Sequence, residues 1–89
     1  MELLILKNKM KAKMYSTSRC IWCDRVEKML GEYGVDDIEK IDVSGSKELL
    51  KEMQIAAGEK VTSVPQVIID GEYIGGYTEV ERFLKRKRT

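Results

Sequence analysis

The sequence predicts an α/β domain in which strands and helices follow the order β-α-β-α-β-β-α, which implies a four-stranded mixed sheet flanked by helices. Three observations support this fold class. The chain has 89 residues, enough for one small hydrophobic core. Strand-like stretches take turns with stretches whose apolar residues recur every three or four positions. An Asp-Gly pair at residues 70–71 separates two apolar runs, as in a tight β-hairpin.

The first strand and helix are predicted within residues 11–34. Residues 11–15 form a short run that leads directly into Ser16-Thr17-Ser18, which is typical of a strand that ends in a loop. Apolar residues then recur at helical spacing from Trp22 to Tyr33, and Gly34 ends this helix.

A second strand and helix follow within residues 38–58. Residues 38–43 alternate between apolar and charged side chains, as in a strand with one buried face. Ser44-Gly45-Ser46 supplies an N-cap for a helix whose apolar stripe runs from Leu49 to Ala57. Gly58 is expected to stop that helix.

The last part of the chain predicts a hairpin and a final helix. Residues 65–69 are apolar and β-branched, and residues 72–74 form the second strand after the Asp-Gly turn. After Gly75-Gly76, the stretch Thr78-Glu79-Val80-Glu81 has the pattern of a capping box, so Thr78 is expected to begin the final helix.

Residues 1–10 fit this plan poorly, and we treat them as an N-terminal extension that precedes a folded domain of residues 11–89. Lysines alternate with other residues from Lys7 to Lys13, which suits a solvent-facing edge better than a buried strand. The extension could be a disordered lead, an added edge strand, or the true first strand followed by a long loop. We favour residues 11–15 as the core strand.

The composition narrows the partners and the location. The net charge of +1 argues against general nucleic-acid binding, and the basic C-terminus fits the negative end of a last helix better than a nucleic-acid tail. The longest apolar run, residues 3–6, is too short to cross a bilayer or to form the core of a signal peptide. We therefore expect a cytoplasmic protein that does not associate with membranes.

Cys20 and Cys23 are the only cysteines, and their spacing at the start of the first helix predicts redox chemistry. At that position, unpaired backbone N–H groups and the positive end of the helix dipole favour a thiolate on Cys20. Arg19 adds a positive charge next to it. Cys20 is therefore expected to be the nucleophile, and Cys23, almost one turn further into the helix, the more buried thiol that resolves a mixed disulfide.

Four other roles for the two cysteines compete with redox catalysis. A structural disulfide is disfavoured in a reducing cytosol, and the loop that it would close is small. Zinc needs four ligands, and the chain has no histidine and no further cysteine, so no metal site is expected within one chain. Two core cysteines at this spacing by coincidence are improbable. An iron–sulfur cluster held between two subunits is the more serious alternative.

Two further motifs agree with a redox site. Val64-Pro65 precedes a strand, and a cis proline at this point would leave the Val64 backbone free to pair with an incoming peptide. Gly75-Gly76 precedes the final helix and would let a carboxylate approach backbone amides there. Taken alone, each motif is equally explained as a simple strand entry or a turn.

Taken together, these residues resemble the glutaredoxin family, over residues 11 to 86. Three segments carry the resemblance: residues 14–17 with Cys20-Ile21-Trp22-Cys23, then residues 62–67, then Asp70-Gly71 with residues 74–79. The chain is most similar to the small dithiol members of phage and bacterial type. The resemblance implies a thioredoxin-like fold and a monomer that reduces protein disulfides and glutathione mixed disulfides. It implies glutathione as the co-substrate, no other bound cofactor, and ribonucleotide reductase as a client.

The resemblance also implies which residues bind glutathione. Val64 and Pro65 match the positions that hold the glutathione backbone, and Trp22 keeps an aromatic surface beside the thiol. The residues that match the binding site for the γ-glutamyl end are Gly76, Tyr77, Thr78 and Glu79.

The departures from the family pattern keep two alternatives open. Ile21 and Trp22 stand where the family usually has proline and tyrosine, and such members bind [2Fe–2S] clusters more readily, so a glutathione-ligated cluster carrier is one alternative. Thr17 stands where a basic residue often binds the glycine carboxylate, with Arg19 as its substitute; its absence favours the second alternative, a redoxin reduced by thioredoxin reductase. Glu79 replaces the commoner aspartate.

Overall fold

The computed structural model describes residues 10–88, and within this part of the chain the elements follow the predicted order. The elements are β1 (Lys11–Ser16), α2 (Ile21–Glu32), β2 (Asp37–Asp42), α3 (Lys47–Ala57), β3 (Gln66–Ile69), β4 (Glu72–Gly75) and α4 (Tyr77–Arg88). Apart from Met10, the predicted N-terminal extension lies outside the described residues, so its structure stays a prediction.

The strands form one four-stranded mixed sheet in the order β2-β1-β3-β4. β1 pairs in parallel with β2 and antiparallel with β3, and β3 and β4 form an antiparallel hairpin. The predicted fold class is therefore confirmed. β1 lies in the middle of the sheet, with Ala12, Met14 and Tyr15 buried, which agrees with the choice of residues 11–15 as the core strand.

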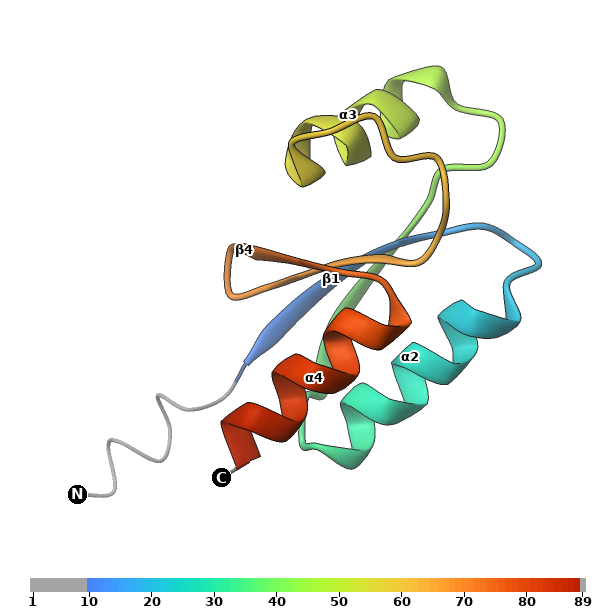
Figure 1. Ribbon diagram of the computed structural model, residues 1–89. Coiled ribbons are helices and arrows are strands. Elements are labelled where there is room, and N and C mark those ends of the chain that lie inside the picture. The colour runs from blue at the N-terminus through green and yellow to red at the C-terminus, as the bar shows by residue number, and fades with distance from the viewer. Residues whose placement is uncertain (1–9, 89) are drawn as a thin grey trace.

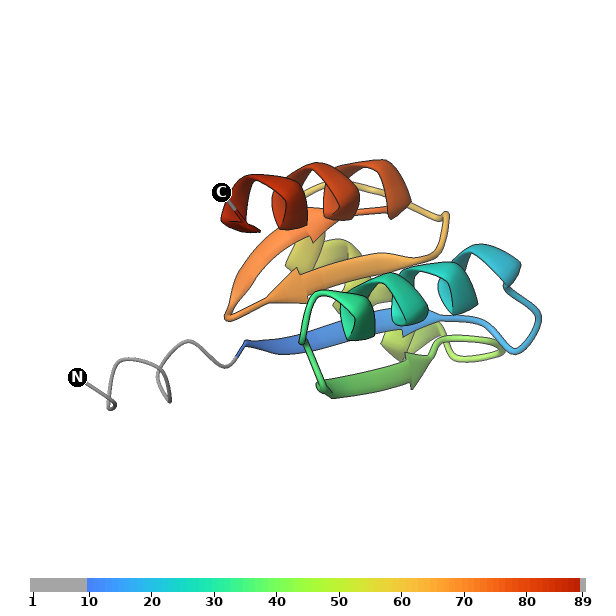
Figure 2. The same ribbon diagram turned by 90° about the horizontal axis from the view of Figure 1, so that it is seen from below.

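Helices cover both faces of the sheet. Figure 1 shows α2 and α4 on one face and α3 on the other, and Figure 2 shows the same layers turned by 90°. Successive residues of a strand point to opposite faces, so Met14 packs in the cluster beneath α2 and α4, with Val26 and Leu84, whereas Tyr15 packs with Met53 beneath α3. Two small cores, one on each face, therefore support the same central strand.

The predicted helix boundaries hold for the first two helices. Tyr33 is the C-cap of α2, and Gly34 follows it with a φ of 85°. Ser46 caps α3, since its Oγ accepts a hydrogen bond from the Leu49 N–H at 3.1 Å. Gly58 ends α3 in the left-handed conformation, with a φ of 77°.

The start of the final helix differs from the prediction. α4 begins at Tyr77, and the first turn closes when the Val80 N–H donates to the Gly76 carbonyl at 2.9 Å. Glu79 Oε1 accepts a hydrogen bond from the Gly76 N–H at 3.0 Å, which is the return bond of a capping box. Gly76 therefore occupies the N-cap position that the sequence predicted for Thr78. The acidic residue that bonds back to the N-cap amide is Glu79, two residues before the Glu81 of the predicted capping box.

Candidate active site

Cys20 and Cys23 lie at the first turn of α2, directly after the loop that leaves β1, and they form a disulfide in this structure. Cys20 is the N-cap: its Sγ accepts a hydrogen bond from the Cys23 N–H at 3.0 Å. Cys20 is partly buried, while the side chain of Cys23 is 2% exposed and belongs to the core. The structure thus shows the difference in exposure that the sequence predicted.

Ile21, which stands where the family usually has proline, occupies the first helical position of α2. Proline is well tolerated there because the first backbone N–H has no helical partner. The replacement therefore leaves the helix start unchanged, and it places a 69% exposed apolar side chain beside the disulfide.

The loop before β3 carries the Val64-Pro65 bond, which is cis. Pro65 is buried, and Val64 packs at the edge of both hydrophobic clusters. Within residues 10–88, neither the N–H nor the carbonyl of Val64 takes part in a backbone hydrogen bond of the loops or strands. These groups therefore remain available for a bound peptide.

A network of hydrogen bonds, which the sequence did not reveal, holds this loop against the hairpin. The buried Gln66 donates through Nε2 to the carbonyl and to the Oγ of Ser63, at 3.0 and 3.2 Å. Its Oε1 accepts from the Tyr73 hydroxyl at 2.6 Å. Burial, followed by the negative charges of Glu59 and Glu79, raises the pKa of Tyr73, so its hydroxyl remains a donor at neutral pH.

A pocket of about 420 Å³ lies between these segments and includes most of the predicted binding residues. Its lining residues are Trp22, Glu59, Ser63, Val64, Pro65, Gln66, Tyr73, Ile74, Gly75, Gly76, Tyr77 and Glu79. Arg19 and Thr78 are exposed and do not line it. The lining contains two carboxylates, Glu59 and Glu79, and no lysine or arginine. Neither cysteine lines the pocket, but Trp22, which lies between them in the sequence, does.

Aromatic contacts fix the wall of the pocket near the cysteines. The rings of Trp22 and Tyr77 meet edge to face with their centroids 5.1 Å apart. The guanidinium carbon of Arg25 lies 4.8 Å from the centre of the Trp22 ring. Arg25 was not among the predicted residues, although its position three residues after Trp22 places both side chains on one helix face.

The N-terminus of α4 closes the other side of the pocket, and the Gly76 N–H there is already bonded to Glu79. Gly75 has a φ of 128°, and a Cβ atom at this position would lie 3.0 Å from Cβ and Cγ of Glu79. Glycine at this position therefore permits the close approach of Glu79 to the backbone.

Two further kinds of site, for metal ions and for membrane insertion, have no counterpart within residues 10–88. No group of three or more cysteine, aspartate or glutamate side chains is arranged to hold a metal ion. None of the described helices combines the length and the apolar character that a membrane crossing requires.

Comparisons with known proteins agree with this geometry. The family model for Glutaredoxin matches residues 12–74. A glutaredoxin of Neisseria meningitidis is 36% identical over 69 residues, which cover 78% of this chain and 79% of that protein. The crystal structure of Glutaredoxin 1 from Francisella tularensis, complexed with cacodylate, has a TM-score of 0.72 and 28% identity, and the match covers 89% of this chain and 96% of that one.

A buckwheat glutaredoxin–glutathione complex shares the fold, with a TM-score of 0.70 and 22% identity over 98% of this chain and 79% of that one. The fold and the Cys20–Cys23 pair define a thiol–disulfide oxidoreductase with a thioredoxin-like architecture. Within that class, the chain belongs to the glutaredoxin family.

Proposed function

We propose that this protein uses glutathione to reduce protein disulfides and glutathione mixed disulfides through Cys20 and Cys23. One observation carries the proposal: the helix start that bears Cys20, the free Val64 backbone and the N-terminus of α4 border one pocket. A tripeptide thiol needs these three features, since its sulfur, its backbone and its charged end must be held at the same time.

The reaction begins with the thiolate of Cys20, which the amides at the helix start stabilise. It attacks a disulfide of the client, so that a Cys20–client mixed disulfide forms and one client thiolate leaves. Cys23 then attacks Cys20 Sγ and releases the second client thiolate, which produces the Cys20–Cys23 disulfide seen in the structure. Two client thiols are formed, and the protein is oxidised by two electrons.

Glutathione restores the dithiol in two steps. A first glutathione thiolate attacks Cys20 Sγ, giving a Cys20–glutathione mixed disulfide and a free Cys23 thiol. A second glutathione attacks the glutathione sulfur of that mixed disulfide, so glutathione disulfide leaves and the Cys20 thiolate returns. A glutathionylated client enters this cycle directly, because Cys20 attacks its glutathione sulfur and the client thiol departs.

The pocket offers complementary groups for glutathione. The Val64 N–H and carbonyl pair with the cysteinyl backbone, against Pro65 and beside the Trp22 ring. The γ-glutamyl carboxylate meets the positive end of α4 at Tyr77 and Thr78. Its ammonium meets Glu79, which shares its carboxylate with the Gly76 N–H. The glycine carboxylate faces Arg19, the exposed cation beside Cys20.

The proposal extends to the setting in which the protein works. A dithiol that cycles with glutathione needs a reducing compartment, so we place the protein in the cytoplasm. The protein's resemblance to the family supports two further parts of the proposal, namely that it is a monomer and that ribonucleotide reductase is a client. Electron transfer to the purified reductase, measured as deoxyribonucleotide formation, tests that assignment.

The central test uses a small glutathione mixed disulfide, glutathione, glutathione reductase and NADPH. We expect Cys20→Ser to abolish turnover and Cys23→Ser to retain it with this substrate, while losing the reduction of protein disulfides. Replacing glutathione and its reductase with thioredoxin reductase is expected to stop the reaction. Activity that survives Cys20→Ser, or that needs thioredoxin reductase, contradicts the proposal.

A further inference from the structure

A second groove lies between β4 and α4, and Glu79 is the only residue assigned above to glutathione that lines it. Its volume is about 580 Å³, and its lining residues are Glu72, Tyr73, Ile74, Glu79, Arg82, Phe83, Lys85 and Arg86. We call it the β4–α4 groove. Tyr73, Ile74 and Glu79 also line the glutathione pocket, so the two hollows are neighbours at β4 and the start of α4.

The groove lies along the outer edge of the sheet. Within residues 10–88, β4 is the last strand of the sheet and pairs only with β3. Because neighbouring residues of a strand point to opposite faces, a hollow lined by three consecutive residues, Glu72 to Ile74, extends around the edge of β4. An edge strand presents backbone groups that an extended segment can pair with. The occupant that best fits this shape is an extended peptide.

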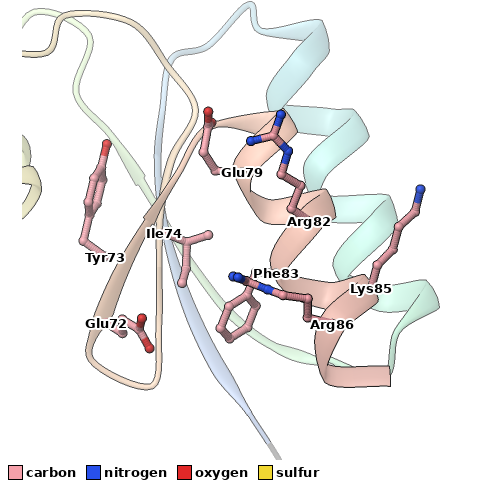
Figure 3. Close-up of a pocket in the computed structure, with 8 residues that line it drawn as sticks. All are labelled: Glu72, Tyr73, Ile74, Glu79, Arg82, Phe83, Lys85 and Arg86. Atoms are coloured by element: carbon pink, nitrogen blue, oxygen red, sulfur yellow. The ribbon is translucent and has the colours of Figure 1, made fainter. Parts of the chain in front are cut away.

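The helical wall of the groove is basic. Arg82, Lys85 and Arg86 all come from α4 and line the groove. In Figure 3, Arg86 extends over Phe83 toward β4, Arg82 points toward the Glu79 end, and Lys85 points away from β4. Arg82 is exposed and makes no ion pair with any residue that the structure describes. It lies in the second turn of α4, too far from the C-terminus to complement the helix dipole.

Lys85 is paired with Glu81 at 3.6 Å, and the two carboxylates that line the groove lie toward its two ends. Glu79 accepts the Gly76 N–H at the end nearest the glutathione pocket. Figure 3 places Glu72 near the opposite end, by the hairpin turn. Between these two ends, the guanidinium of Arg86 lies beside Phe83 and Ile74 (Figure 3). A segment that crosses the middle of the groove therefore meets positive charge first.

We propose that the β4–α4 groove docks an acidic segment of a protein client, adjacent in the client chain to the cysteine that reacts with Cys20. This inference rests on the proposed function. In the binding mode proposed above, glutathione contacts Glu79 alone among the groove residues, so we expect the groove to select among protein clients and to leave turnover of small mixed disulfides unchanged. Exposed charge pairs act mainly on encounter and selection and are weakened by salt.

The test compares two peptides of equal length, each closed by an internal disulfide. One carries four Asp and Glu residues before its first cysteine, and the other carries Ser and Gln there. We expect Arg82→Gln/Arg86→Gln to lower kcat/KM for the acidic peptide about three- to tenfold, with less than a twofold change for the neutral peptide. Raising the ionic strength from about 0.05 M to about 0.3 M should remove the preference of the unaltered protein.

Lys28→Gln/Lys51→Gln is the matched control, because it removes two exposed charges from α2 and α3 and neither residue lines the pocket or the groove. Equal rates on both peptides in the unaltered protein, or the same loss in the control variant, overturn the proposal. A small glutathione mixed disulfide is assayed in parallel, since failure there contradicts the proposed function. Calorimetric titration of the protein with the acidic peptide, in which both peptide cysteines are replaced by serine, tests the groove without turnover. Absence of binding in this titration also overturns the proposal.

Discussion

Trp22 shows how much of the site is decided by single side chains. It is half exposed, yet its ring is held between the edge contact with Tyr77 and the guanidinium of Arg25. Each such contact contributes about 0.5–1 kcal/mol at an exposed position. An exposed indole that would otherwise turn freely is thus kept as a wall of the pocket.

We expect Arg25→Met to loosen this ring while keeping much of the packing. Trp22 is the chain's one tryptophan, so its fluorescence reports on it directly. Acrylamide quenching should increase, and KM for a small glutathione mixed disulfide should rise about two- to fivefold while kcat stays within twofold.

Arg25→Lys keeps the cation over the ring and should restore most of both signals, whereas Lys28→Met, on the same helix, should leave them unchanged. Unaltered quenching in Arg25→Met would show that the cation does not restrain the ring.

The sequence predicted the site residues whose role follows from residue type alone. A dithiol spacing identifies Cys20 and Cys23, and an X-Pro pair marks Val64. It did not identify Gln66 or Tyr73, because their hydrogen bond forms only when β3 and β4 are paired. Arg25 was missed although its spacing from Trp22 along α2 is a local signal. Nor could it show that Glu79 bonds the Gly76 amide, since Thr78 offers an equally good local capping pattern.

At the scale of elements, two glycines illustrate opposite requirements. Gly75 ends β4 with a positive φ, and a Cβ there would lie only 3.0 Å from Cβ and Cγ of Glu79. Gly31 lies inside α2, exposed, and a Cβ added there would meet nothing within 4 Å. The turn into α4 requires glycine at position 75. Glycine at position 31 lowers helix stability, and no contact there requires it.

We expect Gly75→Ala to lower the free energy of unfolding by about 1–3 kcal/mol, because it forces a strained backbone and displaces Glu79. Gly31→Ala is expected to raise it by about 0.5–1 kcal/mol. Urea unfolding followed by circular dichroism measures both. The opposite signs are the decisive result, and a stabilised Gly75→Ala protein would refute the close contact.

Element order was largely predictable from the sequence because each element carries its own period and punctuation. The start of α4 was predicted two residues late because two capping patterns overlap, one that begins at Gly76 and one that begins at Thr78. The first is used in the structure because glycine at position 75 allows Glu79 to approach the backbone and accept the Gly76 N–H. The position of β1 between β2 and β3 was not encoded in any local pattern, since it depends on which edges pair.

At the scale of the whole molecule, the second core links β1 to α3 through a titratable group. The buried Tyr15 donates its hydroxyl to Glu52 Oε2 at 2.8 Å. Burial, then the hydrogen bond and charge of Glu52, raise the pKa of Tyr15 to about 12. The folded chain therefore keeps a proton that the unfolded chain loses from about pH 10 upward.

Stability is accordingly expected to fall as the pH rises from about 10 to about 12, with the Tyr15 contribution fully present below that range. Urea unfolding of the unaltered protein and of Tyr15→Phe at about pH 9, 10 and 11 measures this effect. Lysines titrate in the same range, so the difference between the two proteins isolates Tyr15. If the free energies of unfolding of the two proteins change with pH in parallel, the raised pKa of Tyr15 is contradicted. Some loss of stability with rising pH is still expected in Tyr15→Phe from Tyr73, whose pKa is also raised.

The hydrogen bond from the Cys23 amide to Cys20 Sγ makes one atom both the cap of a helix and the centre of the redox reaction. Thermodynamic reciprocity follows from this double use. Any free energy with which the start of α2 favours the thiolate over the thiol is returned as greater stability of that helix turn when Cys20 is ionised. The acidity of the Cys20 thiol and the stability of the first turn of α2 are therefore coupled by one free energy, and a substitution that frays this turn is expected to make Cys20 a weaker acid.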